Sequence, residues 1–123
     1  MRKKIVTTLR RIRRLEDQRD RLLKRLLVAD PLLCASLSLV KRTCGKPNCH
    51  CATQPSHEAW VLATSQRGRR RCQVVRQDDI DDVRRRLELY KDYREGLRAL
   101  EATHNEEKRL LRGLMEERNV PYE

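Results

Sequence analysis

Three of the five cysteines of the chain lie within eight residues, at Cys44, Cys49 and Cys51 of the stretch CGKPNCHC. Thiolates are soft ligands, and a structural zinc ion takes four such groups in a tetrahedron. Gly45 and Pro47 favour a sharp turn between them, because glycine tolerates positive φ and proline presets φ. The spacing C-x4-C-x-C is a variant of the commoner C-x2-C. It predicts a metal-binding knuckle, with zinc as the expected ion.

The fourth ligand of this knuckle is not fixed by the spacing. His57 is favoured, because it follows Cys51 at a distance that lets a loop return its imidazole to the cysteines. Cys72 and His50 remain alternatives, although a side chain between two ligands is expected to point away. A catalytic zinc would need an open position and a general base, for which Glu58 is the formal candidate. No carboxylate cluster or phosphate loop accompanies it, so we expect a structural ion, no catalytic residue and no enzyme.

The positive charge of the chain is concentrated in its first two thirds. The net charge is +11, and residues 1–29, 30–77 and 78–123 contribute +8, +6 and −3. Basic segments rich in arginine are typical of proteins that bind phosphate backbones, and a well-solvated surface is the alternative. The candidate nucleic-acid contacts lie on the first segment, around the knuckle and in a later turn: Arg10, Arg11, Arg13, Arg14, Lys41, Arg42, Lys46, Arg67, Arg69, Arg70 and Arg71.

The elements that must position these residues follow from hydrophobic periodicity. Residues 3–29 predict one long basic helix, with apolar residues at helical spacing and a stop at Asp30-Pro31. Residues 36–41 alternate like a strand, and residues 59–64 and 70–75 predict a hairpin with a two-residue turn at Arg67-Gly68. This turn would set Val61 opposite Val74, Ala63 opposite Cys72 and Trp60 opposite Val75. Cys34, among apolar neighbours, is expected to be buried.

A second long helix is expected from Asp78 onward, opened by four aspartates that suit the helix dipole. Its apolar seam begins at Ile80, Val83, Leu87, Tyr90, Arg94 and Leu97, and is expected to continue through His104, Leu111 and Met115. The predicted fold is therefore α+β. It has a basic helix (1–29), a zinc knuckle with a three-stranded antiparallel sheet (30–77) and a coiled-coil helix (78–123). Because the last helix is the longer one, part of its seam lacks an intrachain partner, which favours a homodimer through the helices.

The stretch SLVKR running into CGKPNCHCA, followed by His57, Trp60, a basic turn with glycine and Tyr93-Arg94, resembles a family of small bacterial proteins of unknown function. Members of that family are typically encoded beside transposases and other mobile-element genes. The resemblance covers about half of the chain, and its specific part is the cysteine stretch. It implies a zinc site at Cys44, Cys49, Cys51 and His57. The family often has Gly-Pro after that histidine, where this chain has Glu58-Ala59.

The location expected from the sequence is the cytoplasm. The first fifteen residues carry charge throughout, which a signal peptide does not, and no segment has the ~20 apolar residues of a membrane span. The odd number of cysteines fits metal ligands better than a disulfide framework.

Two functions follow as hypotheses. The first is a non-enzymatic, zinc-stapled accessory protein that binds double-stranded DNA and acts with a transposase or recombinase. The second is a metal-stapled coiled-coil module for protein interaction or oligomerisation that does not contact DNA directly. RNA in place of DNA is left open, whereas single-strand binding is disfavoured because the aromatic residues are few and scattered.

Overall fold

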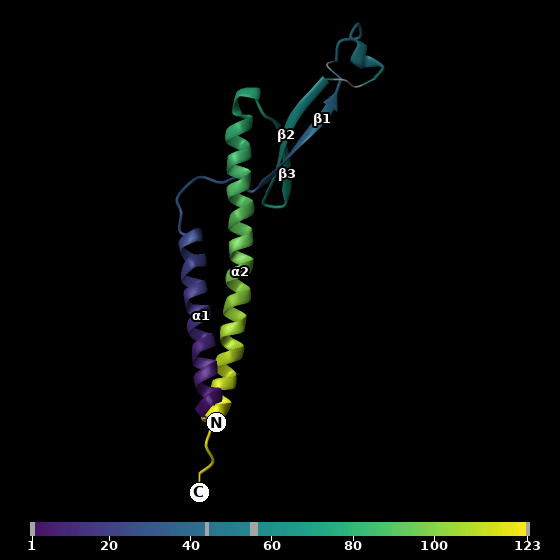
Figure 1. Ribbon diagram of the computed structural model, residues 1–123. Coiled ribbons are helices and arrows are strands. Elements are labelled where there is room, and N and C mark those ends of the chain that lie inside the picture. The colour runs from purple at the N-terminus through teal and green to yellow at the C-terminus, as the bar shows by residue number, and fades with distance from the viewer. Residues whose placement is uncertain (1, 44, 55–56, 123) are drawn as a thin grey trace. The chain divides into compact units, whose positions relative to one another are not determined.

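A computed structural model describes residues 2–43, 45–54 and 57–122 of the chain, without the side chains of Arg2 and Cys51. The elements in order are the helix α1 (Arg2–Leu26), the strand β1 (Ala35–Arg42), the 3-10 turn η1 (His50–Ala52), the strands β2 (His57–Gln66) and β3 (Arg69–Val74), the 3-10 turn η2 (Gln77–Asp79) and the helix α2 (Ile80–Arg118) (Figure 1). The predicted α+β fold, with two long helices and a three-stranded antiparallel sheet between them in the sequence, is confirmed.

The chain divides into two compact units. Met1–Asp30 and Asp92–Glu123 form one, called here the helical unit, and Pro31–Lys91 forms the other, called the sheet unit. The long helix α2 contributes its first turns to the sheet unit and the rest to the helical unit.

Within the part of the chain that the structure describes, no helix is both long and apolar enough to cross a membrane.

In the helical unit, α1 turns one row of side chains toward α2, and the members of this row are three and four residues apart. This spacing is the heptad repeat of a coiled coil, and it lets the two helices pack side by side over several turns. Neither Gly nor Pro interrupts α1, and the hydroxyls of Thr7 and Thr8 donate to the carbonyls of Lys3 and Lys4. The row consists of Ile5, Thr8, Ile12, Leu15, Arg19, Leu22 and Leu26.

The facing row of α2 differs from the predicted seam. His104, Leu111 and Met115, expected in the seam, are exposed, and Leu97 is exposed as well. The less exposed positions lie one residue earlier in each case. The prediction extended the heptad register of the apolar residues at the start of α2, whereas the packed row combines leucines with small and polar residues. It consists of Gly96, Leu100, Thr103, Glu107, Leu110, Leu114 and Glu117.

Two contacts explain why small and polar residues occupy part of this row. A Cβ on Gly96 would lie 2.8 Å from Cδ2 of Leu26, so the absence of a side chain there makes room for the last packed residue of α1. Farther along, the guanidinium of Arg19 donates to the carboxylate of Glu107 at 3.2 Å. Glu107 is buried, and such a pair specifies one register of the two helices, because any shift would leave a buried charge unpaired.

The helix α1 ends at Leu26, three residues before the predicted end at residue 29. The amide of Leu27 still donates to the carbonyl of Leu23, but the side chains of Leu27 and Val28 are exposed. Since a helix depends mainly on packing of its apolar face, nothing supports a further turn beyond the contact of Leu26.

The predicted sheet and its register are confirmed. The strand order is β1-β2-β3, all antiparallel, and β2 and β3 are joined through the two-residue turn at Arg67-Gly68. Val61 lies opposite Val74 and Ala63 opposite Cys72. The amide of Val75 donates to the carbonyl of Trp60 beyond the end of β3. Cys34, which was expected to be buried, is an exposed thiol just before β1, so that prediction is wrong.

One face of the sheet packs on the first turns of α2. Leu62 on this face is buried, as are Ile80 and Val83 of the helix. The guanidinium of Arg84 lies 4.8 Å from the centre of the Trp60 ring, a cation–π contact between helix and sheet. The amide of Leu33 also donates to the carbonyl of Arg86. This face is therefore the core side of the sheet unit.

Candidate nucleic-acid interface and metal knuckle

The turn between β2 and β3 carries an arginine in an unusual backbone conformation. Arg67 has φ of 52° and Gly68 has φ of 78°, so both central residues of the turn lie in the left-handed region. This type of hairpin turn favours Asn-Gly, because asparagine and glycine enter that region at low cost. An arginine there is strained by about 1 kcal/mol or more. Strain held at an exposed position suggests that the side chain is kept for a purpose other than stability.

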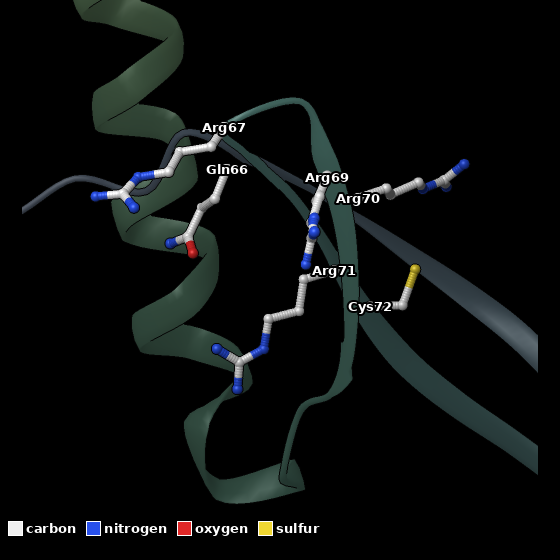
Figure 2. A pocket seen from close by; sticks show the side chains of 6 residues that line it. All are labelled: Gln66, Arg67, Arg69, Arg70, Arg71 and Cys72. Atoms are coloured by element: carbon white, nitrogen blue, oxygen red, sulfur yellow. The ribbon is translucent and has the colours of Figure 1, made fainter.

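Four arginines surround this turn, and they point to both sides of the sheet. Gln66, Arg67, Arg69, Arg70, Arg71 and Cys72 line one open hollow at the tip. Figure 2 shows the side chain of Arg71 on the side of α2, and Arg70 and Cys72 pointing away from it. Among the described residues, no carboxylate lies within ion-pair distance of these four arginines. The tip is therefore a cluster of uncompensated positive charge.

The knuckle lies between β1 and β2, at the end of the sheet opposite the arginine tip. Its turns are closed by backbone hydrogen bonds from Cys49 to the Lys46 carbonyl and from Ala52 to the Cys49 carbonyl. Gly45 has φ of 82°, which supports the prediction of a sharp glycine turn here. Sγ of Cys49 lies 3.2 Å from Nε2 of His57 at the start of β2. Two of the four predicted zinc ligands are thus in contact.

The other two predicted ligands, Cys44 and the side chain of Cys51, lie outside the described residues. Within the described part of the chain, no third His, Cys, Asp or Glu completes a metal-binding group with the first pair. On a tetrahedral zinc ion, sulfur and nitrogen ligands would be about 3.5 Å apart, given Zn–S and Zn–N bonds of about 2.3 and 2.0 Å. The observed separation of Cys49 and His57 is close to this value, so this pair fits one edge of a zinc site.

The alternatives for the fourth ligand are placed less favourably. Cys72 lies opposite Ala63, six residues along β2 from His57, which is about 20 Å at the rise of a strand. No single ion can contact both ends of that span. His50 is exposed in η1, and its carbonyl accepts a hydrogen bond from the Thr53 hydroxyl.

The basic residues near the knuckle are separated from the arginine tip by the length of β2, which is about 30 Å for ten residues. Lys41, Arg42 and Lys46 are all exposed. Lys41 lies opposite Glu58 in the register, on the core side of the sheet, whereas Arg42 lies opposite His57 on the other side. The predicted contacts of the sheet unit therefore form two separate basic ends.

On α1, the four candidate arginines are exposed and differ in their surroundings. Arg10, Arg13 and Arg14 form no ion pair with any described residue. Arg11 lines the groove between α1 and α2 together with Arg109, and its charge helps to lower the pKa of Glu106. The main cause of that lowered pKa is the hydrogen bond that Arg109 donates to Glu106. Arg11 thus has a role inside the helical unit.

Basic and small polar residues share one face of the sheet, a feature that was not predicted from the sequence. Arg42 and Arg70 fall on the side away from α2 once the register is known, and so do Ser36 and Ser38. The signal was present in the period-2 alternation of the strands, which places every second residue on one face. Only the apolar residues and the hairpin partners were predicted from that alternation.

The chain matches a family model. Residues 7–85, more than half of the chain, match the domain of unknown function DUF6788. The match covers most of α1, the whole knuckle and sheet, and the first turns of α2. Comparison with curated proteins and with solved structures finds no match. The chain therefore belongs to the family defined by the domain DUF6788.

Proposed function

We propose that the protein is a non-enzymatic accessory factor that binds double-stranded DNA through the sheet unit. The observation that carries this proposal is the turn at Arg67, where an arginine occupies a strained position beside three further arginines without described acidic partners. Clusters of this kind bind phosphates, because guanidinium groups make bidentate contacts to their oxygens. The exposed arginines of α1 would add contacts to the backbone.

A zinc ion at Cys44, Cys49, Cys51 and His57 is part of this proposal. Its role would be structural, and it would fix the ends of β1 and β2 so that the basic ends of the sheet keep a defined spacing. The contact of Cys49 with His57 supports the site. The resemblance to proteins encoded beside mobile elements supports a transposase or recombinase as the protein partner. The same resemblance, together with thiolates that need a reducing compartment, supports a cytoplasmic location.

The test is the salt dependence of binding to a labelled DNA duplex, measured by fluorescence anisotropy. Each lost phosphate contact should reduce the slope of log K against log salt by about 0.9. The variant Arg67→Asn is informative because asparagine favours the turn, so the fold should be kept while one contact is lost. Arg98→Asn removes the same charge from an exposed position of α2 and should leave the slope unchanged.

Two outcomes would contradict the proposal. Equal slopes for the wild type, Arg67→Asn and Arg98→Asn would mean that the tip does not contact phosphates. No binding by the zinc-loaded wild type near physiological salt would exclude DNA as the partner.

A second function is favoured by the exposed apolar residues of the helical unit. Leu9 and Leu23 each follow a packed residue of α1, and Leu97 and Leu111 each follow a packed residue of α2. In an antiparallel helix pair, these positions lie on the same side, and together they form an apolar flank. A second copy of the chain packing on this flank would give a homodimeric four-helix arrangement. The protein would then serve as an oligomerisation or protein-interaction module, with or without DNA.

Light scattering across a dilution series tests this second function. The variant Leu111→Lys should convert a dimer to a monomer, and Val120→Lys, at an exposed position beyond the end of α2, should not. A wild-type protein that stays monomeric at all concentrations would rule out the homodimer.

A further inference from the structure

We infer that the uncovered face of the sheet is the surface that enters the major groove of DNA. The inference rests on the proposed DNA-binding function and specifies the surface that performs it. This surface, called the open face, is centred on six small residues of β1 and β2. They are Ser36, Ser38, Ala59, Val61, Ala63 and Ser65.

The open face is identified from the register and the packing of α2. Trp60 and Leu62 of β2 face the helix, because one contacts Arg84 and the other is buried. Val61 and Ala63 alternate with them and therefore point away from it. The residues paired with these two on β1 are Ser38 and Ser36, both exposed. No helix of the sheet unit covers this side in the described residues.

The size of the face fits a major groove. Strands lie about 4.8 Å apart, so the sheet is about 10 Å across from β1 to β3, and the major groove of B-form DNA is about 12 Å wide. Small side chains allow the backbone of the strands to approach the base edges closely. The hydroxyls of Ser36, Ser38 and Ser65 can donate to or accept from bases, and the methyl groups of Ala63 and Val61 can contact thymine.

The charge of the face is complementary to DNA. Arg42 lies at one end, opposite His57, and Arg70 lies at the other, opposite Ser65. These two positions are eight residues of β2 apart, which is about 26 Å along the strand. No aspartate or glutamate of the described strands points to this side, and Glu58 points to the other. Two cations at the ends would hold phosphates while the neutral centre meets the bases.

The same features select duplex DNA over other nucleic acids. The major groove of A-form RNA is deep and too narrow for side chains to read. Single strands are held by stacking on aromatic side chains, and the described open face has none, since Trp60 lies on the core side under Arg84. Groove binding by a sheet is a known mode in which strands replace the recognition helix.

The experiment compares two neutral-to-acidic substitutions on opposite faces of the sheet. Ser38→Glu places a carboxylate at the centre of the open face, and Gln73→Glu places one at an exposed position of β3 on the core side. Both change the net charge by the same amount. Affinity of the zinc-loaded full chain for a duplex should fall about tenfold or more for Ser38→Glu and change little for Gln73→Glu. Ser36→Glu, on the same face, provides an independent second substitution, and circular dichroism verifies the fold of each variant.

The outcomes separate this inference from the proposed function. If Arg67→Asn weakens binding and folded Ser38→Glu and Ser36→Glu do not, the tip binds DNA and the open-face inference is overturned. If the wild type binds no duplex, both the proposed function and this inference are wrong. If Ser38→Glu alters the oligomeric state of the DNA-free protein but not its DNA affinity, the open face pairs two copies and the inference is wrong. A loss for both open-face variants, with Gln73→Glu unaffected, supports it.

Discussion

The helical unit and the sheet unit are stabilised in different ways. In the helical unit, each helix supplies a row of seven positions. The two rows are matched by Gly96 opposite Leu26 and by the partly buried ion pair of Arg19 with Glu107. In the sheet unit, one face packs on α2 and the other is uncovered by any helix of this unit, and the buried residues described there are Leu62, Ile80 and Val83. A single small core in a unit of this size, Pro31–Lys91, rarely supplies more than about 3–5 kcal/mol, so the sheet unit is only marginally stable without further support.

This difference indicates a division of labour between the units. The helical unit uses its interior to fix register, and its stability comes from packing along the whole length. Under the proposed function, the sheet unit would leave a face and a turn free for binding, and a zinc ion would stabilise the end where β1 and β2 meet. Functional surfaces are often built where stability is sacrificed in this way. The comparison predicts that the two units respond differently to the same perturbation.

The largest expected effect is that of removing the proposed zinc ion. Chelation should unfold the sheet unit and leave the helical unit folded, because the free energy of zinc binding to such a site is on the order of 10 kcal/mol. Amide hydrogen exchange should show protection lost in β1 and β2 and kept in α1. Cys49→Ser should have the same effect as the chelator, and Cys72→Ser, which alters an exposed thiol, should not.

Unchanged amide protection of β1 and β2 in the metal-free protein would contradict the expected difference in stability between the two units. It would mean that the packing of Leu62 on Ile80 and Val83 suffices to hold the sheet. A protein that loses protection equally in both units would show instead that the two units unfold together.

The next effect tests the ion pair of the helical unit. Arg19→Ala should lower the free energy of unfolding by about 2 kcal/mol, since it leaves the buried Glu107 carboxylate without a partner. Arg25→Ala is the matched control. The distances from its guanidinium to Asp92 and Glu95 are 3.8 and 3.7 Å, with all three side chains exposed, so the expected loss is below about 0.5 kcal/mol. Urea denaturation followed by the helical circular-dichroism signal measures both.

Replacing both partners sharpens this test. The double variant Arg19→Leu, Glu107→Leu should recover most of the lost stability, because a pair with a buried carboxylate can often be exchanged for apolar residues at little cost. Equal losses for Arg19→Ala and Arg25→Ala would show that the pair does not specify the register of the two helices.

The sequence predicted the sheet unit better than the helical unit in detail. A two-residue turn fixes the register of a hairpin, so the Arg67-Gly68 turn was sufficient to place Val61 opposite Val74 and Cys72 opposite Ala63. Both long helices were also correct in type, since their apolar periods are long and uninterrupted by proline. The packed row of α2 was predicted wrongly, because the choice between Leu97 and Gly96 depends on the shape of the facing Leu26.

The same limit applies to the site. A buried glutamate is not expected from hydrophobicity, and Glu107 belongs to the packed row only because Arg19 stands opposite. The contact of Cys49 with His57 was anticipated as part of the ligand set. The open face was not anticipated, because it depends on which side of the sheet α2 covers. Such information lies in the packing of distant segments and not in any local pattern.

A smaller effect distinguishes the two glycines within α2. Gly113→Ala should stabilise the helical unit by about 0.5–1 kcal/mol, because alanine favours helix and its Cβ would meet no atom within 4 Å. At Gly96 the same substitution places a Cβ 2.8 Å from Cδ2 of the buried Leu26, so the gain should be cancelled or reversed. Thermal unfolding of the two variants gives the comparison directly. A gain at both positions would mean that Leu26 moves aside freely and that its contact with Gly96 does not define the end of α1.

The smallest effect concerns an exposed pair on α2. The hydrogen bond from Arg109, with Arg11 nearby, holds the pKa of Glu106 below the usual value of a glutamate. A carboxylate whose pKa is lower in the folded than in the unfolded state stabilises the fold above its unfolded pKa. It loses that contribution as the pH falls through the folded pKa. Glu106→Gln should therefore lower the melting temperature slightly at about pH 7, and the difference should shrink and disappear in acid, below the usual glutamate pKa of about 4.3. The control is Glu101→Gln, which replaces an exposed glutamate on the same helix and should leave the melting temperature unchanged at both pH values. If the difference for Glu106→Gln does not depend on pH, the effect comes from packing of the side chain and not from its charge. The charges of Arg11 and Arg109 in their shared groove would then contribute nothing through Glu106.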